Sequence, residues 1–276
     1  MAESREALLK RLEDQALLIR RNSWRALRAS SGGHVGGAMS AADILAALYF
    51  HRMRIRADEP DWPDRDRFVL SKGHGNAALS SVLAQAGFFP ESDLDRFYHL
   101  ESPLGMHPDI KVAGVEMSTG GLGHGLPVGI GMALGARIKG QSFQTFVMTG
   151  DAELHEGSNW EAAMAAAHHR LSNLTVIVDA NKVGQSAHVA ELVGIEPLAD
   201  KWRAFGWEVR EIDGHKMAEV VDALDAIPFN ERKPSALIAH TVKGKGVSFA
   251  EDTYVWHSNT VNDEILERAL AELGSR

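Results

Sequence analysis

The chain has 276 residues, 45% of them hydrophobic, so it can bury a large core and lies near the upper size of a single domain. Its 29 basic and 37 acidic side chains give a net charge of −8 without a basic cluster, which argues against a nucleic acid partner. Cysteine is absent, no apolar run approaches the roughly 20 residues of a membrane span, and residues 1–10 lack the apolar core of a signal peptide, so we expect a reducing, cytoplasmic setting without a membrane partner.

Two amphipathic patterns near the start of the chain predict helices. In residues 6–29, apolar side chains recur at helical spacing among charged ones. A second pattern covers residues 40–51, with Ser40 as the expected N-cap and Asp43 three residues later, an arrangement close to a capping box. Residues 58–67, which are rich in proline and acidic side chains, are expected to form a loop.

Five short apolar runs follow, separated mostly by helical segments. This alternation predicts an α/β fold with a doubly wound, mostly parallel sheet flanked by helices, in one domain covering residues 1–276. A last helix is expected from Asn262, with Gly274 as its stop. The predicted strands are Phe68–Leu70, Thr145–Met148, Thr175–Val178, Trp207–Ile212 and Ala236–Ala239.

Polar side chains follow two of these strands. Asp151 comes directly after the strand that ends in Gly150, and Asn181 follows the next strand along the chain. Ligands bind at the carboxyl edge of open parallel sheets, so both oxygens should face one site. Mg²⁺ and Ca²⁺ prefer such oxygens, and Asp151, Asn181 and the carbonyl of Val183 would suit them, with a diphosphate completing the shell. The alternative is that Asp151 and Asn181 are ordinary turn residues.

A glycine-rich loop from Ser118 to Gly125 leads into an apolar helix predicted over residues 126–137. Glycine lets a backbone approach a ligand closely and present N–H groups at a helix N-terminus, so the loop glycines are candidates for ligand contact. The glycines inside the helix are interpreted as allowing close packing against the sheet; they are Gly129, Gly131 and Gly135.

With these elements in place, the segment from Gly150 to Asn181 resembles the thiamin diphosphate motif, and Glu156–Ala162 within it looks specifically like transketolase. Four more motifs occur in that family's order and at similar separations. The resemblance covers nearly all of the family's N-terminal, diphosphate-binding domain, and it implies thiamin diphosphate as cofactor with Mg²⁺, or Ca²⁺ or Mn²⁺ in its place. The further motifs are Gly33–Gly37, Ser71–Gly75, Gly105–Asp109 and Gly120–Gly123.

The resemblance also implies which residues hold the cofactor. Asp151, Asn181 and the Val183 carbonyl match the metal ligands. Ala152 replaces a glycine that is usual in the family, which adds a methyl group beside the diphosphate. The residues that match cofactor contacts are His74, Gly120, Gly121, Leu122, Gly150, Asp151, Ala152, Glu153, Asn181 and His257.

Four residues resemble catalytic groups of the family. His34 and His107 resemble histidines that act on sugar hydroxyls, and His257 resembles a histidine of the substrate channel; imidazole suits proton transfer because its pKa lies near neutrality. Glu156 resembles an acid that communicates between the two cofactors of a dimer, with Glu161 in the same network. The alternative for both glutamates is complementarity to the helix dipole.

In this family, the acid that activates the cofactor and most groups that hold sugar phosphate lie in a second domain. We therefore expect the isolated subunit to be inactive. We expect a C-terminal transketolase subunit with the pyrimidine-binding domain as its partner, in a two-plus-two heterotetramer that transfers a two-carbon ketol unit between sugar phosphates.

Three other functions compete with this one. The first is another thiamin diphosphate reaction, such as that of 1-deoxyxylulose phosphate synthase or a 2-oxoacid dehydrogenase, although His34, His74 and His107 favour sugar chemistry. The second is a non-catalytic scaffold that keeps the fold or the cofactor. A histidine-based zinc hydrolase is discounted, because the sequence has 13 histidines but no compact ligand motif.

Overall fold

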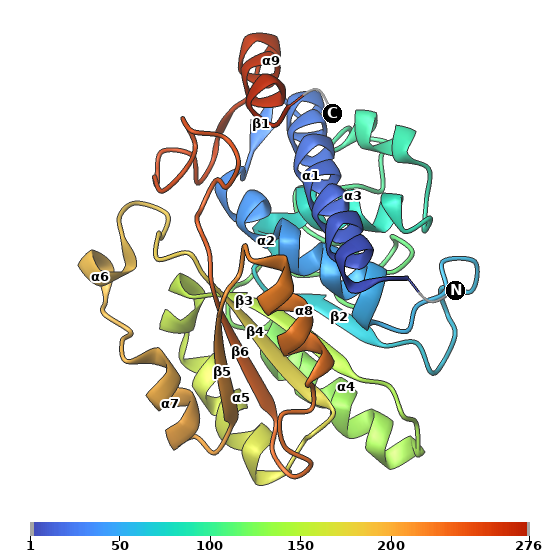
Figure 1. Ribbon diagram of the computed structural model, residues 1–276, viewed down its shortest axis with the longest axis vertical. Helices are drawn as coiled ribbons and strands as arrows, with labels where there is room; N and C mark the ends of the chain where they lie inside the picture. The colour runs from blue at the N-terminus through green and yellow to red at the C-terminus, as the bar shows by residue number, and fades with distance from the viewer. Residues whose placement is uncertain (1–2, 275–276) are drawn as a thin grey trace.

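The computed structural model describes residues 3–274, in which five parallel strands form a sheet in the order β2-β3-β4-β6-β5 (Figure 1). Each predicted strand falls on an observed strand, and the predicted doubly wound fold class is confirmed. The predicted domain limits, residues 1 and 276, lie outside the described residues. The sheet strands are β2 (Arg67–Leu70), β3 (Thr145–Gly150), β4 (Leu174–Ala180), β5 (Glu208–Asp213) and β6 (Ser235–His240).

Helices cover both faces of the sheet, and a two-stranded antiparallel ribbon of β1 (Gly32–Gly33) and β7 (Asn259–Thr260) lies apart from it. The α-helices are α1 (Arg5–Ala29), α2 (Gly36–Ala47), α3 (Asn76–Gln85), α4 (Gly125–Lys139), α5 (Gly157–His168), α6 (Val189–Leu192), α7 (Leu198–Ala204), α8 (Met217–Asp225) and α9 (Asp263–Glu272). Shorter helical turns are η1 (Leu48–Arg52), η2 (Gly73–Gly75), η3 (Glu91–Arg96) and η4 (Ala152–His155).

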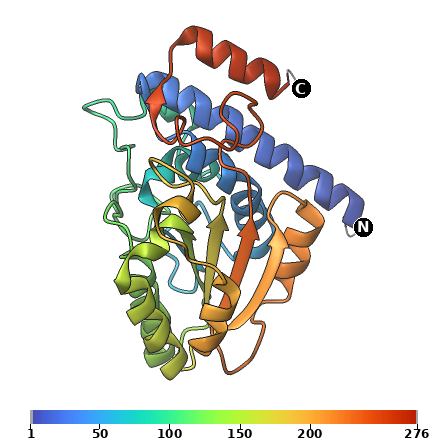
Figure 2. The same ribbon diagram turned by 90° about the vertical axis from the view of Figure 1, so that its left-hand side faces the viewer.

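Alternate residues of the strands belong to two separate hydrophobic cores, because successive side chains of a strand point to opposite faces. In β3, Phe146 and Met148 pack with the apolar residues of α1, α2, α3 and α8. Val147, between them, packs with α4, α5 and α7. Figure 2 shows α8 on one side of the sheet and α4 on the other. This continuous apolar character is what a strand covered on both faces requires.

The two terminal helices follow their sequence signals. Helix α1 covers the predicted residues, with the Ser4 hydroxyl accepting a hydrogen bond from the Ala7 N–H at 3.2 Å. Helix α9 follows Asn262, whose side chain accepts from the Ile265 N–H at 2.9 Å, and Gly274 has the left-handed φ of +78° that ends a helix.

The predicted start of the second helix is wrong. Helix α2 begins at Gly36, and Ser40 lies inside it, where its hydroxyl donates to the Asp179 carboxylate at 2.6 Å. Asp43 pairs with Arg20 instead of completing a capping box. Both side chains that the local pattern assigned to a cap therefore bond to residues far away in the sequence.

Of the three glycines in α4 that were predicted to allow close packing against the sheet, one does so. A Cβ at Gly129 would lie 2.4 Å from Val147 Cγ2, so α4 sits on β3 at that point. Gly131 and Gly135 have nothing within 4 Å of such a Cβ, so the interpretation is wrong for these two. They lie on the side of α4 that faces away from the sheet.

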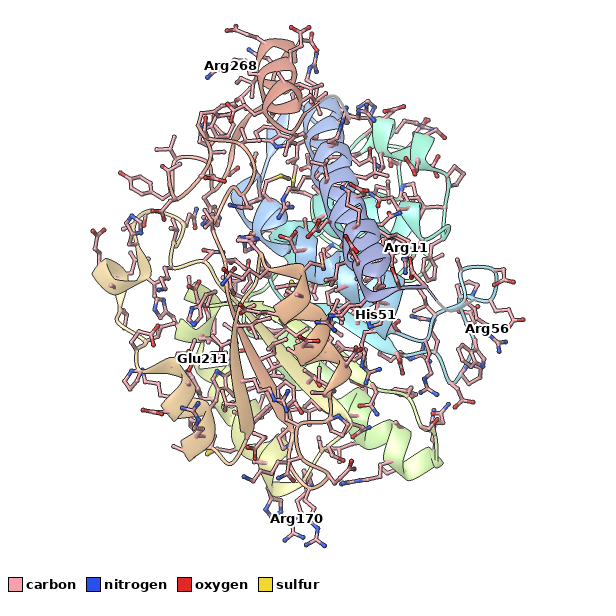
Figure 3. The ribbon with its side chains drawn as sticks, viewed as in Figure 1. Arg11, His51, Arg56, Arg170, Glu211 and Arg268 are labelled. Atoms are coloured by element: carbon pink, nitrogen blue, oxygen red, sulfur yellow. The ribbon has the colours of Figure 1, made fainter. Side chains whose placement is uncertain are left out.

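Charged side chains cover the outside of the molecule, and Arg56, Arg170 and Arg268 project outward at its periphery (Figure 3). In the described part of the chain, no helix has the length and apolar character to cross a bilayer.

The close approach of α4 to β3 yields a test. Gly129→Ala must push the helix off Val147, and we expect it to lower the free energy of unfolding by about 1 to 3 kcal/mol in urea denaturation. Gly131→Ala is the matched control; it adds a methyl group in open space and should leave stability unchanged or raise it by up to about 1 kcal/mol. Equal losses in both variants would contradict the packing argument.

Candidate active site

The carboxyl ends of β2, β3, β4 and β6 border a cavity of about 340 Å³. Most of the residues predicted to form a site line it, although they come from segments far apart in the sequence. Of the remaining predicted residues, Gly121 and Glu156 are exposed and outside the lining. The predicted residues in the lining are His34, His74, His107, Gly120, Leu122, Gly150, Asp151, Ala152, Glu153, Asn181, Val183 and His257.

Asp151 joins the ends of two neighbouring strands. One carboxylate oxygen accepts from the Ala152 N–H at 2.8 Å, and the other accepts from the Lys182 N–H at 2.6 Å. Burial raises the pKa of Asp151 to about 6, and the nearby negative charge of Asp179 adds to this shift. The carboxylate is therefore short of positive charge, which a bound cation would supply.

Asn181 and Val183 bring two further oxygens to the same place. The Asn181 side-chain oxygen accepts from the Val183 N–H at 3.1 Å, while its NH₂ group donates to Asp179 at 3.2 Å, which fixes the direction of the amide. Carboxylate, amide and carbonyl oxygens are donors that Mg²⁺ accepts. Among the described residues, no three His, Cys, Asp or Glu side chains form a metal cluster, so a cation here would need ligands from water or a phosphate.

Glu153 organises the glycine-rich loop. Its buried carboxylate accepts from the Ser71 hydroxyl at 2.5 Å, from the Gly123 N–H at 2.9 Å and from the Gly150 N–H at 3.0 Å. Gly123 needs to be glycine, because its φ is +75° and a Cβ would lie 2.5 Å from Ser158 Oγ. These bonds fasten the loop that carries Gly120 to the ends of β2 and β3.

Four histidines gather on one side of the cavity. His34 lies with its ring centroid 5.2 Å from that of His74, 6.2 Å from that of His107 and 5.3 Å from that of His257. Burial lowers the pKa of His34, lowers the pKa of His74 well below its usual range, and lowers the pKa of His257 to about 3. Neighbouring histidines and lysines lower each of these pKa values further. These three rings are therefore neutral at pH 7, and each has one nitrogen to donate and one to accept a hydrogen bond.

A buried carboxylate behind the cavity was not predicted. Asp179 in β4 is fully buried and accepts hydrogen bonds from Ser40 and Asn181 and from Lys72 and Thr241 at short range. Burial would raise the pKa of Asp179, but the Lys72 ammonium and these hydrogen bonds outweigh it and lower the pKa. The ion pair with Lys72 connects the end of β2 to β4.

Two lysines of the cavity were also missed. Lys72, within the motif Ser71–Gly75, additionally donates to the Gly37 carbonyl at 2.7 Å. Lys243 donates to the Val183 and Gly184 carbonyls, both at 2.7 Å, and burial, with the charge of Lys72, lowers the pKa of Lys243 to about 8. A signal for Lys243 existed: it stands three residues after the last strand of the sheet, at the edge where ligands bind.

A second buried ion cluster supports the segment that carries Lys243. His215 accepts from the Val242 N–H at 2.8 Å with Nε2, so its Nδ1 carries the hydrogen that is donated to Asp43 at 2.7 Å. Asp43 also pairs with Arg20 of α1. Burial would raise the pKa of Asp43, but Arg20 and the bonds from His215 outweigh it and lower the pKa to about 2.

Comparisons with known proteins identify the family of this chain. The family model described as "Transketolase, thiamine diphosphate binding domain" matches residues 13–276. The crystal structure of transketolase from Campylobacter jejuni superposes with a TM-score of 0.90 and 31% identity, covering 96% of this chain and 43% of that one. Fold and cavity define the class as a thiamin-diphosphate-binding domain with a parallel sheet. The chain belongs to the transketolase family.

Relatives of similar length are transketolase subunits by name. The chain is 42% identical over 247 residues to an apulose-4-phosphate transketolase subunit of Phocaeicola vulgatus, covering 90% of this chain and 88% of the relative. It is 41% identical over 263 residues to a 6-deoxy-6-sulfo-D-fructose transketolase subunit of a Clostridium species, covering 95% and 96%. By contrast, the chain spans less than half of the solved transketolases that it matches.

The Asp179–Lys72 pair can be tested in a double-mutant cycle. Asp179→Asn leaves the buried Lys72 ammonium without its counter-ion, and we expect a loss of about 3 to 5 kcal/mol in the free energy of unfolding. Adding Lys72→Met should recover part of that loss, because the unpaired charge is removed. Strictly additive losses, measured by urea denaturation, would show that the pair is not coupled.

The Asp43 cluster predicts a dependence of stability on pH. Its folded pKa of about 2 lies below the ordinary 3.8, so its contribution is present above pH 3.8 and is lost as the pH falls towards 2. The difference in free energy of unfolding between the wild type and Asp43→Asn should shrink by about 1 kcal/mol from pH 5 to pH 3. Urea titrations at both pH values measure it, and a constant difference would contradict the assignment.

Proposed function

We propose that this chain is the cofactor-binding subunit of a two-chain transketolase that transfers a two-carbon ketol unit between sugar phosphates. The observation that carries the proposal is the convergence in one cavity of three oxygen donors, Asp151, Asn181 and Val183, with a cluster of four histidines. Oxygen donors suit a cation that holds a diphosphate, and neutral imidazoles suit hydroxyl groups.

The residues of the cavity divide into a cofactor side and a substrate side. On the cofactor side, Asp151, Asn181 and the Val183 carbonyl hold Mg²⁺, or Ca²⁺ or Mn²⁺ in its place. The diphosphate contacts are assigned to His74, Gly120, Gly121, Leu122, Gly150, Ala152, Glu153 and His257. For Glu153 the contact is indirect, because its carboxylate already holds three donors of the glycine loop and strand ends.

On the substrate side, His34, His107 and His257 orient the sugar hydroxyls and move protons to and from them. His34 and His257 are suited to this because burial keeps them neutral at pH 7. When bound, thiamin diphosphate supplies the electron sink for cleavage and formation of the carbon–carbon bond. Glu156, exposed at the start of α5, is assigned to communication between two active sites, together with Glu161.

A partner chain completes the site. The two carboxylates in the cavity lining, Asp151 and Glu153, are both engaged by backbone N–H groups, so neither is free to activate the cofactor. The names of the relatives support a second polypeptide, and we propose a C-terminal transketolase subunit in a two-plus-two heterotetramer. A cytoplasmic location stays a prediction from the cysteine-free sequence.

Mixing the two chains tests the proposal. The partner is captured from native extract and identified by mass spectrometry, and both purified chains are assayed with a ketose phosphate and an aldose phosphate. We expect activity only in the mixture and only with thiamin diphosphate and Mg²⁺. Asp151→Ala should reduce the activity by at least about a hundredfold while the association of the two chains, followed by size-exclusion chromatography, persists.

Two results would contradict this function. Ketol transfer by this chain alone would remove the need for a partner. Condensation of pyruvate with an acceptor by the mixture, without ketol transfer, would support a different thiamin diphosphate reaction. A sulfonated ketose belongs in the same assay, because one relative's name specifies such a substrate.

A further inference from the structure

The ammonium of Lys243 lies among the predicted metal ligands. The residue is 3% exposed, and Nζ donates to the Val183 carbonyl at 2.7 Å and to the Gly184 carbonyl at 2.7 Å. It also donates to Nδ1 of His257 at 2.9 Å. One backbone oxygen assigned to the metal is thus already bound to a positive charge from the same chain.

Surrounding structure holds the lysine in this place. The aliphatic part of Lys243 crosses Gly36, where an added Cβ would lie 2.6 Å from Lys243 Cγ. On the chain that carries it, the Val242 N–H is bound to His215 and the Gly244 N–H donates to the Gly36 carbonyl at 3.0 Å. Hydrogen bonds therefore hold the backbone on both sides of Lys243, and Gly36 packs against its aliphatic chain.

We propose that Lys243 is an internal occupant of the cation site, whose ammonium holds the Val183 carbonyl until a divalent cation displaces it. Mg²⁺ binds oxygen at about 2.0 to 2.1 Å, so two cations on this one carbonyl would lie within roughly 5 Å of each other. At that distance in a buried site their repulsion is strong, and binding of one excludes the other. The inference rests on the proposed function, because it takes Asp151, Asn181 and Val183 as the cation's ligands.

Displacement of the Lys243 ammonium by a divalent cation has a structural consequence on the substrate side of the cavity. While Lys243 occupies the site, its charge offsets only part of that of Asp151, and it gives His257 a hydrogen-bond donor. After displacement, His257 Nδ1 loses that donor and becomes free to bind a hydroxyl. Filling of the cation site is thereby coupled to the state of a histidine assigned to substrate.

Binding of Mn²⁺ alone to the full-length chain tests this, with electron paramagnetic resonance as the readout. Lys243→Met removes the occupant, and we expect Mn²⁺ to bind about tenfold more tightly or better than to the wild type. Lys182→Met is the matched control. This variant also loses one positive charge next to the site. Because the Lys182 side chain is exposed and does not occupy the cation site, we expect the variant to bind Mn²⁺ like the wild type.

Equal or weaker binding by Lys243→Met, or an equal gain in Lys182→Met, overturns the inference, because displacement would then play no part. Absence of Mn²⁺ binding in Lys243→Met overturns it as well. Asp151→Asn in the Lys243→Met background should abolish the gain, and persistence of the gain would show that the ion binds elsewhere. The proposed function is judged separately by ketol transfer in the mixture of the two chains, so the two failures are distinguishable.

Discussion

The carboxylate of Asp179 is buried at the end of β4, and donors from four parts of the chain meet at it. A buried carboxylate without partners is costly, so the chain gains stability only when these donors converge. The donors belong to the segments that border the cavity: Ser40 in α2, Lys72 after β2, Asn181 after β4 and Thr241 after β6. Satisfying this one charge therefore assembles the site.

The ligand-binding side of the cavity is organised in the same way. Glu153 accepts hydrogen bonds from two backbone N–H groups and one hydroxyl, so groups of the chain itself hold the glycine-rich loop in position. Such preorganisation lowers the entropic cost of binding a flexible diphosphate. Its cost is the burial of several charges, which the ion pair of Lys72 with Asp179 and the hydrogen bonds to Glu153 offset.

The electrostatic character of the cavity follows from what burial does to each type of side chain. Burial raises the pKa of Asp151 and lowers those of His34, His74, His257 and Lys243. Each shift disfavours the charged form. The histidines respond by remaining neutral, whereas the pKa of Lys243, lowered to about 8, stays above 7 because the nearby carboxylates of Asp151 and Asp179 oppose the lowering. A cation at Asp151 would relieve the remaining imbalance, which links the geometry to the metal-bound cofactor proposed for this site.

Features that depend on neighbouring residues could be predicted from the sequence. Periodicity predicted the strands and the helices α1 and α9, and Asp151 and Asn181 were found because they follow strands whose ends must meet at one edge. Tertiary structure decided the rest. Ser40 is not a cap because its partner Asp179 lies 139 residues away, and Lys72 and Lys243 find their partners 107 and 60 residues away. The local sequence pattern carries no information on such pairs. A polar side chain requires a hydrogen-bond or ion-pair partner because it is buried, and only the packed fold determines which partner lies near it.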